Sequence, residues 1–170
     1  MDKKETTPVM AGIVVGLLMV VYTLLLYLTG WYLIQFTQYV GSLIMFVGIV
    51  YCIRNHGKEK EYNATFGNLF AFGFKMTAVI TCILILYTFL SGFIFPDVKT
   101  KIIEMARENA LKQPNANESQ VELGMEMFAK NYTIFIIMGL LFWNLVVGSI
   151  TSLIGAAITK KKPKNNFQDL

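Results

Sequence analysis

Four long apolar stretches dominate the sequence, and shorter polar segments separate them. They cover residues 9–28, 33–53, 76–95 and 134–158. The hydrocarbon core of a bilayer is about 30 Å thick, so a helix that rises about 1.5 Å per residue needs roughly 20 apolar residues to cross it. Each stretch meets that length, and the sequence therefore predicts four transmembrane helices.

The composition favours lipid over water as the surroundings of these helices. Hydrophobic residues make up 55% of the chain and charged residues 15%, whereas soluble domains carry about 25% charged residues. A soluble helix has a polar face, but the first, second and fourth stretches are apolar on nearly every side. We therefore predict an all-α integral membrane protein, with residues 1–170 as a single four-span membrane domain.

The basic residues indicate the orientation of the spans. With four crossings, ten of the fifteen basic residues fall on the side that holds both termini. They are Lys3, Lys4, Arg54, Lys58, Lys60, Lys75, Lys160, Lys161, Lys162 and Lys164. The long segment 96–132 carries the other five beside six acidic residues. The positive-inside rule then predicts cytoplasmic termini and an outward-facing segment 96–132.

The third and fourth spans are expected to begin before their most apolar parts. Phe66, Phe70 and Phe74 recur every fourth residue, so they share a helical face that leads into the third span. We place these two spans at about 67–95 and 133–158. The first two stay at about 9–28 and 33–53.

The segment 96–132 is expected to form an amphipathic helical hairpin between spans three and four. Pro96 suits the first position of a helix, and apolar residues at three- and four-residue spacing continue to about Leu111. Ser119 followed by Glu122 resembles a capping box and predicts the start of the second helix. We expect the hairpin to cap the bundle, with a docking surface for a partner as the alternative.

Small residues at helical spacing mark candidate packing faces. Gly12 and Gly16 lie four residues apart in the first span. Gly148, Ser152 and Gly155 form a longer stripe in the fourth. Small side chains let two helix backbones approach closely in a membrane, so these five positions are predicted to contact neighbouring helices.

Two polar residues lie within or beside the spans. Lys75 falls about 30 Å before Pro96 along the third helix, so its ammonium is expected at the inner boundary, where its long stem reaches the headgroups. A role in ion coupling is the alternative. Asn144 lies near the middle of the fourth span, and we expect it to hydrogen-bond to another helix.

No grouping of side chains predicts catalysis. Residues 54–62 are interpreted as a solvated loop, and its His56, the one histidine of the chain, as a surface residue without a second ligand or base nearby. We therefore predict no catalytic, cofactor-binding or metal-binding residue. Because the basic residues flank spans, where they meet lipid headgroups, nucleic-acid binding is not expected.

Three segments carry a resemblance to a known family. They are Phe66-Gly67-Asn68-Leu69-Phe70, Phe95-Pro96-Asp97 and the run of small and apolar residues at 147–158. The chain resembles a family of small bacterial four-span membrane proteins catalogued as a domain of unknown function. The resemblance covers most of the chain, including the helical insertion, and implies a bacterial inner membrane. It implies no activity or cofactor.

These observations favour a non-enzymatic inner-membrane protein that acts as a packing, scaffold or regulatory subunit. Its expected partners are the lipid bilayer and either another membrane protein or further copies of the chain. The alternative is a small oligomeric transporter or channel, for which Lys75 and Asn144 are the relevant residues. A membrane enzyme is disfavoured because the chain lacks grouped nucleophiles, bases and metal ligands.

Overall fold

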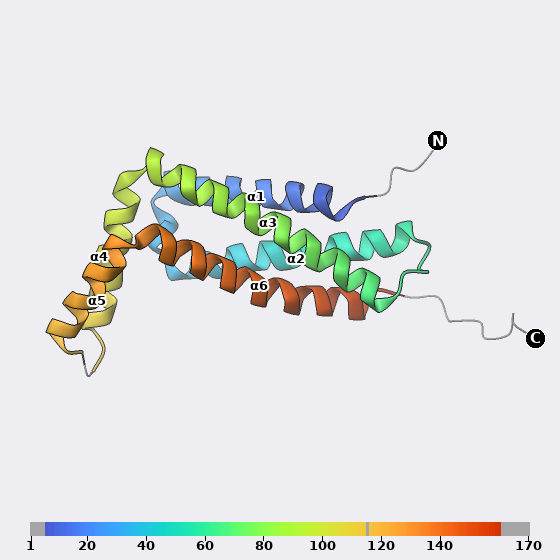
Figure 1. Cartoon of the computed structure of the whole chain (residues 1–170). Helices are drawn as coiled ribbons and strands as arrows, with labels where there is room; N and C mark the ends of the chain where they lie inside the picture. The colour runs from blue at the N-terminus through green and yellow to red at the C-terminus, as the bar shows by residue number, and fades with distance from the viewer. Residues whose placement is uncertain (1–5, 115, 161–170) are drawn as a thin grey trace, which may run out of the picture. The chain divides into compact units, whose positions relative to one another are not determined.

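The computed structural model describes residues 6–114 and 116–160, and every regular element in this part of the chain is a helix (Figure 1). The helices are α1 (Pro8–Thr29), the short 3₁₀ helix η1 (Trp31–Leu33), α2 (Gln35–Glu59), α3 (Phe66–Ile94), α4 (Pro96–Leu111), α5 (Glu118–Lys130) and α6 (Tyr132–Ile158). The predicted all-α class is confirmed, and so is the pair of helices between spans three and four.

In the described part of the chain, four helices are long and apolar enough to cross a membrane. They are α1, α3 and α6 over their whole length and residues Tyr39–Glu59 of α2. The protein is therefore a multi-pass membrane protein. Most large apolar side chains on these helices are exposed, among them Leu17, Val47 and Phe142. Lipid around the helices accounts for that exposure, since soluble proteins rarely expose large apolar patches.

The second helix differs from its predicted bounds. Residues 54–59 continue α2 as regular helix, whereas the sequence suggested a solvated loop beginning at Arg54. His56, expected at the surface, has a side chain only 15% exposed. The reason is tertiary, because polar side chains in this last turn find partners on neighbouring segments. The chain turns back only after Lys60, where Glu61 and Tyr62 adopt positive φ angles.

Local signals fix the ends of α1. The Thr7 side chain accepts a hydrogen bond from the backbone N–H of Met10, and Pro8 occupies the first turn. At the other end, Gly30 adopts a left-handed conformation with φ 74° that a residue with a side chain rarely takes up. The chain then reverses into α2, and the Tyr22 hydroxyl donates to the Thr37 carbonyl across the hairpin.

The described residues divide into two compact units. Of the described residues, 6–83 and 144–160 belong to the first unit, and 84–114 and 116–143 belong to the second. Helices α3 and α6 contribute residues to both units, so the single domain expected from the sequence stays a prediction.

The first unit has a narrow apolar core. Its fully buried side chains include Met45, Ile49 and Ile53 on α2, at every fourth position, and Met76 and Ile80 on α3. A spacing of four residues keeps side chains on one face of a helix. The core is therefore formed by one face of α2 and one face of α3, and the other faces of these helices are available to contact lipid.

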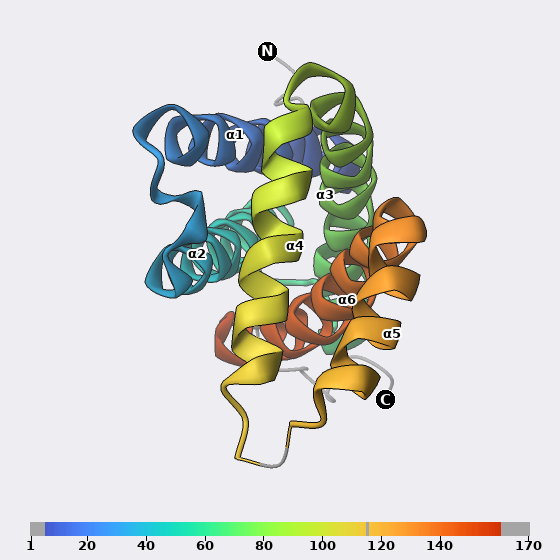
Figure 2. The same ribbon diagram turned by 90° about the vertical axis from the view of Figure 1, so that its left-hand side faces the viewer.

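The second unit contains the end of α3, the helices α4 and α5, and the start of α6. Figure 2 shows α4 and α5 side by side, joined at one end by the connection between Leu111 and Glu118. Asn117 caps α5, because its side-chain oxygen accepts hydrogen bonds from the N–H groups of Ser119 and Gln120. The predicted capping box is therefore wrong. Ser119 lies inside the first turn, and Glu122 instead pairs with Arg107.

Candidate functional site

Small residues bring α1 and α3 into direct contact in the first unit. A carbon added at Gly12 would lie 2.7 Å from Cβ of Val79, and one added at Gly16 would lie 2.7 Å from Cδ1 of Ile83. Carbon atoms in contact normally lie about 3.5–4.0 Å apart. A side chain at Gly12 would therefore force the two helices apart, whereas one at Gly16 would first displace the end of the Ile83 side chain.

A second set of close contacts joins α6 to α2 and α3. A carbon added at Gly148 would overlap Thr77 of α3, and one added at Gly155 would lie 2.7 Å from Cδ1 of Ile53 of α2. Ser152 has 0% of its surface exposed and faces Gly73 of α3. A carbon added at Gly73 would lie 2.6 Å from the Ser152 Oγ. The stripe on α6 thus meets two different helices.

Three threonine hydroxyls accompany these contacts and hydrogen-bond within their own helix, whereas the buried Ser152 hydroxyl has no hydrogen-bond partner among the described residues. Thr77 donates to the carbonyl of Gly73 at 3.0 Å, and Thr81 donates to that of Thr77 at 2.9 Å. Thr159 donates to the carbonyl of Gly155 at 2.7 Å. A hydroxyl bonded to its own helix can be buried without an unpaired polar atom. These groups therefore fit close helix packing.

The two polar residues singled out in the spans lie in different surroundings. Asn144 is 6% exposed and sits on α6 one turn before Gly148, at the start of the same stripe. Lys75 is exposed on α3, ten residues into the helix counted from Phe66. Asn144 therefore belongs to the buried part of the first unit, and Lys75 belongs to its surface.

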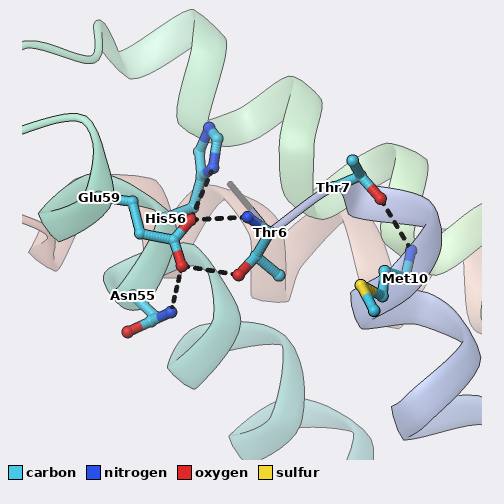
Figure 3. Close-up of polar contacts among 6 residues, drawn as sticks. All are labelled: Thr6, Thr7, Met10, Asn55, His56 and Glu59. Carbon is cyan, nitrogen blue, oxygen red and sulfur yellow. Dashed lines mark hydrogen bonds and ion pairs between the residues drawn. The ribbon is translucent and has the colours of Figure 1, made fainter. Parts of the chain in front are cut away.

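The densest group of polar contacts lies where α2 ends, and it centres on the carboxylate of Glu59 (Figure 3). Thr6 donates to this carboxylate twice, from its backbone N–H at 2.9 Å and from its hydroxyl at 2.6 Å. The Asn55 amide donates to it at 2.8 Å, and Nδ1 of His56 lies 4.0 Å away. We call these four residues, Thr6, Asn55, His56 and Glu59, the Glu59 cluster.

The position of Glu59 is unfavourable for α2 alone. A carboxylate in the last turn of a helix faces the partial negative charge of the helix end. Two hydrogen bonds from Thr6 and one from Asn55 offset this cost, since hydrogen bonds to charged groups are stronger than neutral ones. The cluster therefore connects Thr6 to the last turn of α2. Thr6 directly precedes Thr7, which is the N-cap of α1.

Apolar contacts join the last turns of α2 to α3 and to the residue after α6. The His56 ring stacks on Phe72 with the ring centres 4.2 Å apart and the planes 16° apart. A carbon added at the buried Gly57 would lie 2.5 Å from Cγ2 of Thr159. Helix α3 and the residues flanking α1 and α6, Thr6 and Thr159, therefore all contact the last turns of α2.

The Glu59 cluster is not predicted from the sequence. The spacing of Asn55 and Glu59, four residues apart, puts both side chains on one helical face and was the available signal. Two further facts are needed to predict the cluster. Residues 54–59 are helical, and Thr6, 53 positions before Glu59, donates hydrogen bonds to its carboxylate. Local sequence contains neither fact.

The second unit is held together by charged and aromatic contacts. Arg107 of α4 pairs with Glu122 of α5 at 2.7 Å. The ammonium of Lys99 lies 5.7 Å from the ring centre of Tyr132, within the range of a cation–π interaction. Phe128 of α5 packs against Tyr132 and Phe135 of α6, with ring centres 5.7 and 5.8 Å apart. These contacts anchor the α4–α5 hairpin to the first turns of α6.

Within the described ranges, 6–114 and 116–160, no three His, Cys, Asp or Glu side chains are grouped so that they could hold a metal ion. The Glu59 cluster offers one carboxylate, and that carboxylate already accepts three hydrogen bonds. The arrangement is suited to holding helix ends together.

Comparison with known proteins gives one match. No curated protein and no solved structure is significantly similar to the chain. Residues 11–161 match a family described as a protein of unknown function, DUF4199. The match includes all four long apolar helices and the α4–α5 hairpin, although the first residues of α1 lie just before it. The chain therefore belongs to the DUF4199 family of proteins of unknown function.

Proposed function

We propose that this protein is a non-enzymatic subunit of the bacterial inner membrane, with a packing, scaffold or regulatory role in a larger membrane assembly. The observation that carries the proposal is the chemistry of the groups buried between its spans. They are the hydroxyls of Thr77, Thr151 and Ser152 and the amide of Asn144. Such groups serve helix association in membranes.

The ionisable side chains of the described residues support the same proposal. Glu59 accepts hydrogen bonds at the end of the bundle, and His56 is stacked on Phe72. In the hairpin, Glu122 pairs with Arg107 and Glu108 with Lys112. Catalytic sites bring a nucleophile or base into a pocket beside a group that activates it. The contacts of these groups are those of structural ion pairs and helix-end clamps.

We further propose that both termini face the cytoplasm. The support is the asymmetric charge, with ten of the fifteen basic residues on the side of the termini. The contacts of Thr6 and Thr159 with the last turn of α2 are consistent with an even number of crossings.

The proposal is tested by purification of the tagged full-length protein from its own membranes in a mild detergent, followed by mass spectrometry. We expect a second membrane protein in fixed stoichiometry, and we expect the same pair when the tag is moved to that partner. A matched purification after Gly148→Val should recover less of the partner, because the contact of α6 with Thr77 is weakened, whereas Gly139→Val should recover the partner in full.

The result that would overturn the proposal is a homo-oligomer without a partner that conducts a solute when reconstituted in liposomes. That outcome would establish the alternative, a small transporter or channel. In that case Asn144→Ala or Lys75→Ala should reduce the flux while leaving the protein folded.

A further inference from the structure

Helix α5 has two apolar faces, and only one of them is covered by protein. Val121, Met125 and Phe128 are half-buried on the face toward α4 and α6. Leu123 and Met127 lie one helical turn apart on another face, where 66% and 64% of their surfaces are exposed. A surface helix of a hairpin needs one apolar face for packing. The second face requires a separate explanation.

The contacts of Phe128 fix α5 to the start of α6. Only Asn131 separates the two helices, and the Phe128 ring packs against Tyr132 and Phe135 on α6. Figures 1 and 2 show α5 turned sharply away from the direction of the first turns of α6. The helix therefore runs across the start of a span instead of continuing it outward.

This geometry places the exposed apolar face at the depth of the lipid headgroups. Helix α6 has 27 residues, or about 40 Å, which exceeds the hydrocarbon core of about 30 Å by about 10 Å. With Ile158 at one boundary of the core, the first turn of α6 would reach the headgroup region on the other side. Met127 and Leu123 precede the last residue of α5 by about 4.5 and 10.5 Å along the helix axis. Because α5 is turned away from α6, that distance runs mainly along the membrane surface.

The charges on α5 agree with a position at the membrane surface. Glu122 and Glu126 are exposed on the edge beside Leu123, so the helix has a charged edge and an exposed apolar face. This division is typical of helices that lie in the plane of the membrane interface. With Glu118, Glu122 and Glu126 against Lys130, α5 has a net charge of −2. Anionic headgroups would repel it.

We propose that α5 is an interfacial helix whose Leu123 and Met127 side chains insert among the zwitterionic lipids of the outer leaflet. The inference goes beyond the proposed subunit function and does not depend on it, although the assignment to the outer leaflet rests on the proposed orientation.

The test uses the purified full-length chain with Cys52 and Cys82 replaced by alanine and a single new cysteine carrying the fluorophore NBD. Leu123→Cys and Met127→Cys report on the proposed face, and Glu126→Cys is the matched control on the charged edge of the same helix. All three positions are exposed, so folding should be unaffected, which size-exclusion chromatography verifies. The proteins are placed as single copies in phosphatidylcholine nanodiscs, with or without lipid that carries a doxyl quencher near the headgroup.

We expect blue-shifted emission at positions 123 and 127 and at least about twofold stronger doxyl quenching there than at position 126. Part of the shift should be lost when phosphatidylglycerol replaces half of the phosphatidylcholine, because of the charge on α5. Water-like emission at all three positions would overturn the proposal. A blue shift that occurs only with two copies per disc, without doxyl quenching, would also overturn it and would assign the face to a second copy. Neither result depends on the membrane partner sought above.

Discussion

Two glycines of α6 lie in opposite surroundings, although both belong to the same helix. Gly148 is buried against Thr77, and an added carbon would overlap that side chain. Gly139 is exposed, and a carbon added there meets no atom within 4 Å. The difference depends on the helix opposite and not on the helix that carries the glycine.

The same substitution at these two positions should therefore have different effects. Gly148→Val should lower the free energy of unfolding by about 1–3 kcal/mol, the usual cost of overpacking a close contact. Gly139→Val should change it by less than about 0.5 kcal/mol. Reversible unfolding by SDS in mixed micelles measures both values. Equal effects would show that Gly148 does not lie at a helix contact.

Glu59 allows a second prediction at the residue scale. Glu59→Ala removes the acceptor for the Thr6 backbone N–H, so hydrogen exchange of that amide should accelerate. We expect the opening free energy of the Thr6 amide to fall by about 1 kcal/mol, which corresponds to a roughly fivefold faster exchange rate. This value is lower than that for a buried charged acceptor because the site is partly exposed. Glu59→Gln should restore part of the protection, since its amide keeps one acceptor oxygen. Glu104→Ala, on the exposed surface of α4, should leave the exchange of Thr6 unchanged.

At the scale of elements, the α4–α5 hairpin depends on a few contacts at its ends. Pro96 starts α4 directly after Phe95, and Asn117 starts α5 by accepting two backbone hydrogen bonds. Phe128 attaches the end of α5 to α6. The exposed pair of Arg107 and Glu122 contributes little by comparison, because ion pairs in water are typically worth about 0–1 kcal/mol.

The capping of α5 can be tested with two neighbouring substitutions. Asn117→Ala should destabilise α5 by about 0.5–2 kcal/mol, the usual cost of losing an N-cap side chain. The exchange of the Ser119 and Gln120 amides, which donate to Asn117, should rise accordingly. Ser119→Ala should leave it nearly unchanged. A larger effect of Ser119→Ala than of Asn117→Ala would instead support the capping box that the sequence suggested.

At the scale of the whole molecule, the defining property is the set of four apolar helices with basic residues near one set of ends. Lys58 lies in the last turn of α2, Lys60 directly follows that helix, and Lys160 lies just after α6. The hairpin between α3 and α6 has six acidic and five basic residues. This asymmetry is the basis for the proposed orientation.

Labelling of intact cells tests that orientation. In a variant without Cys52 and Cys82, Ser119→Cys should react with a membrane-impermeant maleimide that crosses the outer membrane. Lys58→Cys should react only after the inner membrane is permeabilised. Both side chains are exposed, so a difference in reactivity reports on the side of the membrane. A reversed pattern would place both termini outside.

The elements that the sequence predicts are those whose ends depend on neighbouring residues. Pro8 and Gly30 mark the ends of α1, and Pro96 marks the start of α4. Residues 54–59 are predicted as a loop because they are polar, yet they are helical. Their helix is extended by contacts with Thr6 and Phe72, and these partners lie far away along the chain.

The amino-acid sequence by itself determined that this chain is a four-span helical membrane protein with a helical hairpin before its last span. Hydropathy summed over about 20 residues, together with proline and glycine at helix ends, is a local property that needs no partner. Only the tertiary structure decided that Gly148 meets Thr77, that Thr6 binds Glu59 and that one face of α5 stays uncovered. Those outcomes depend on which helix faces which, and a helix that is apolar on nearly every side does not specify its neighbour.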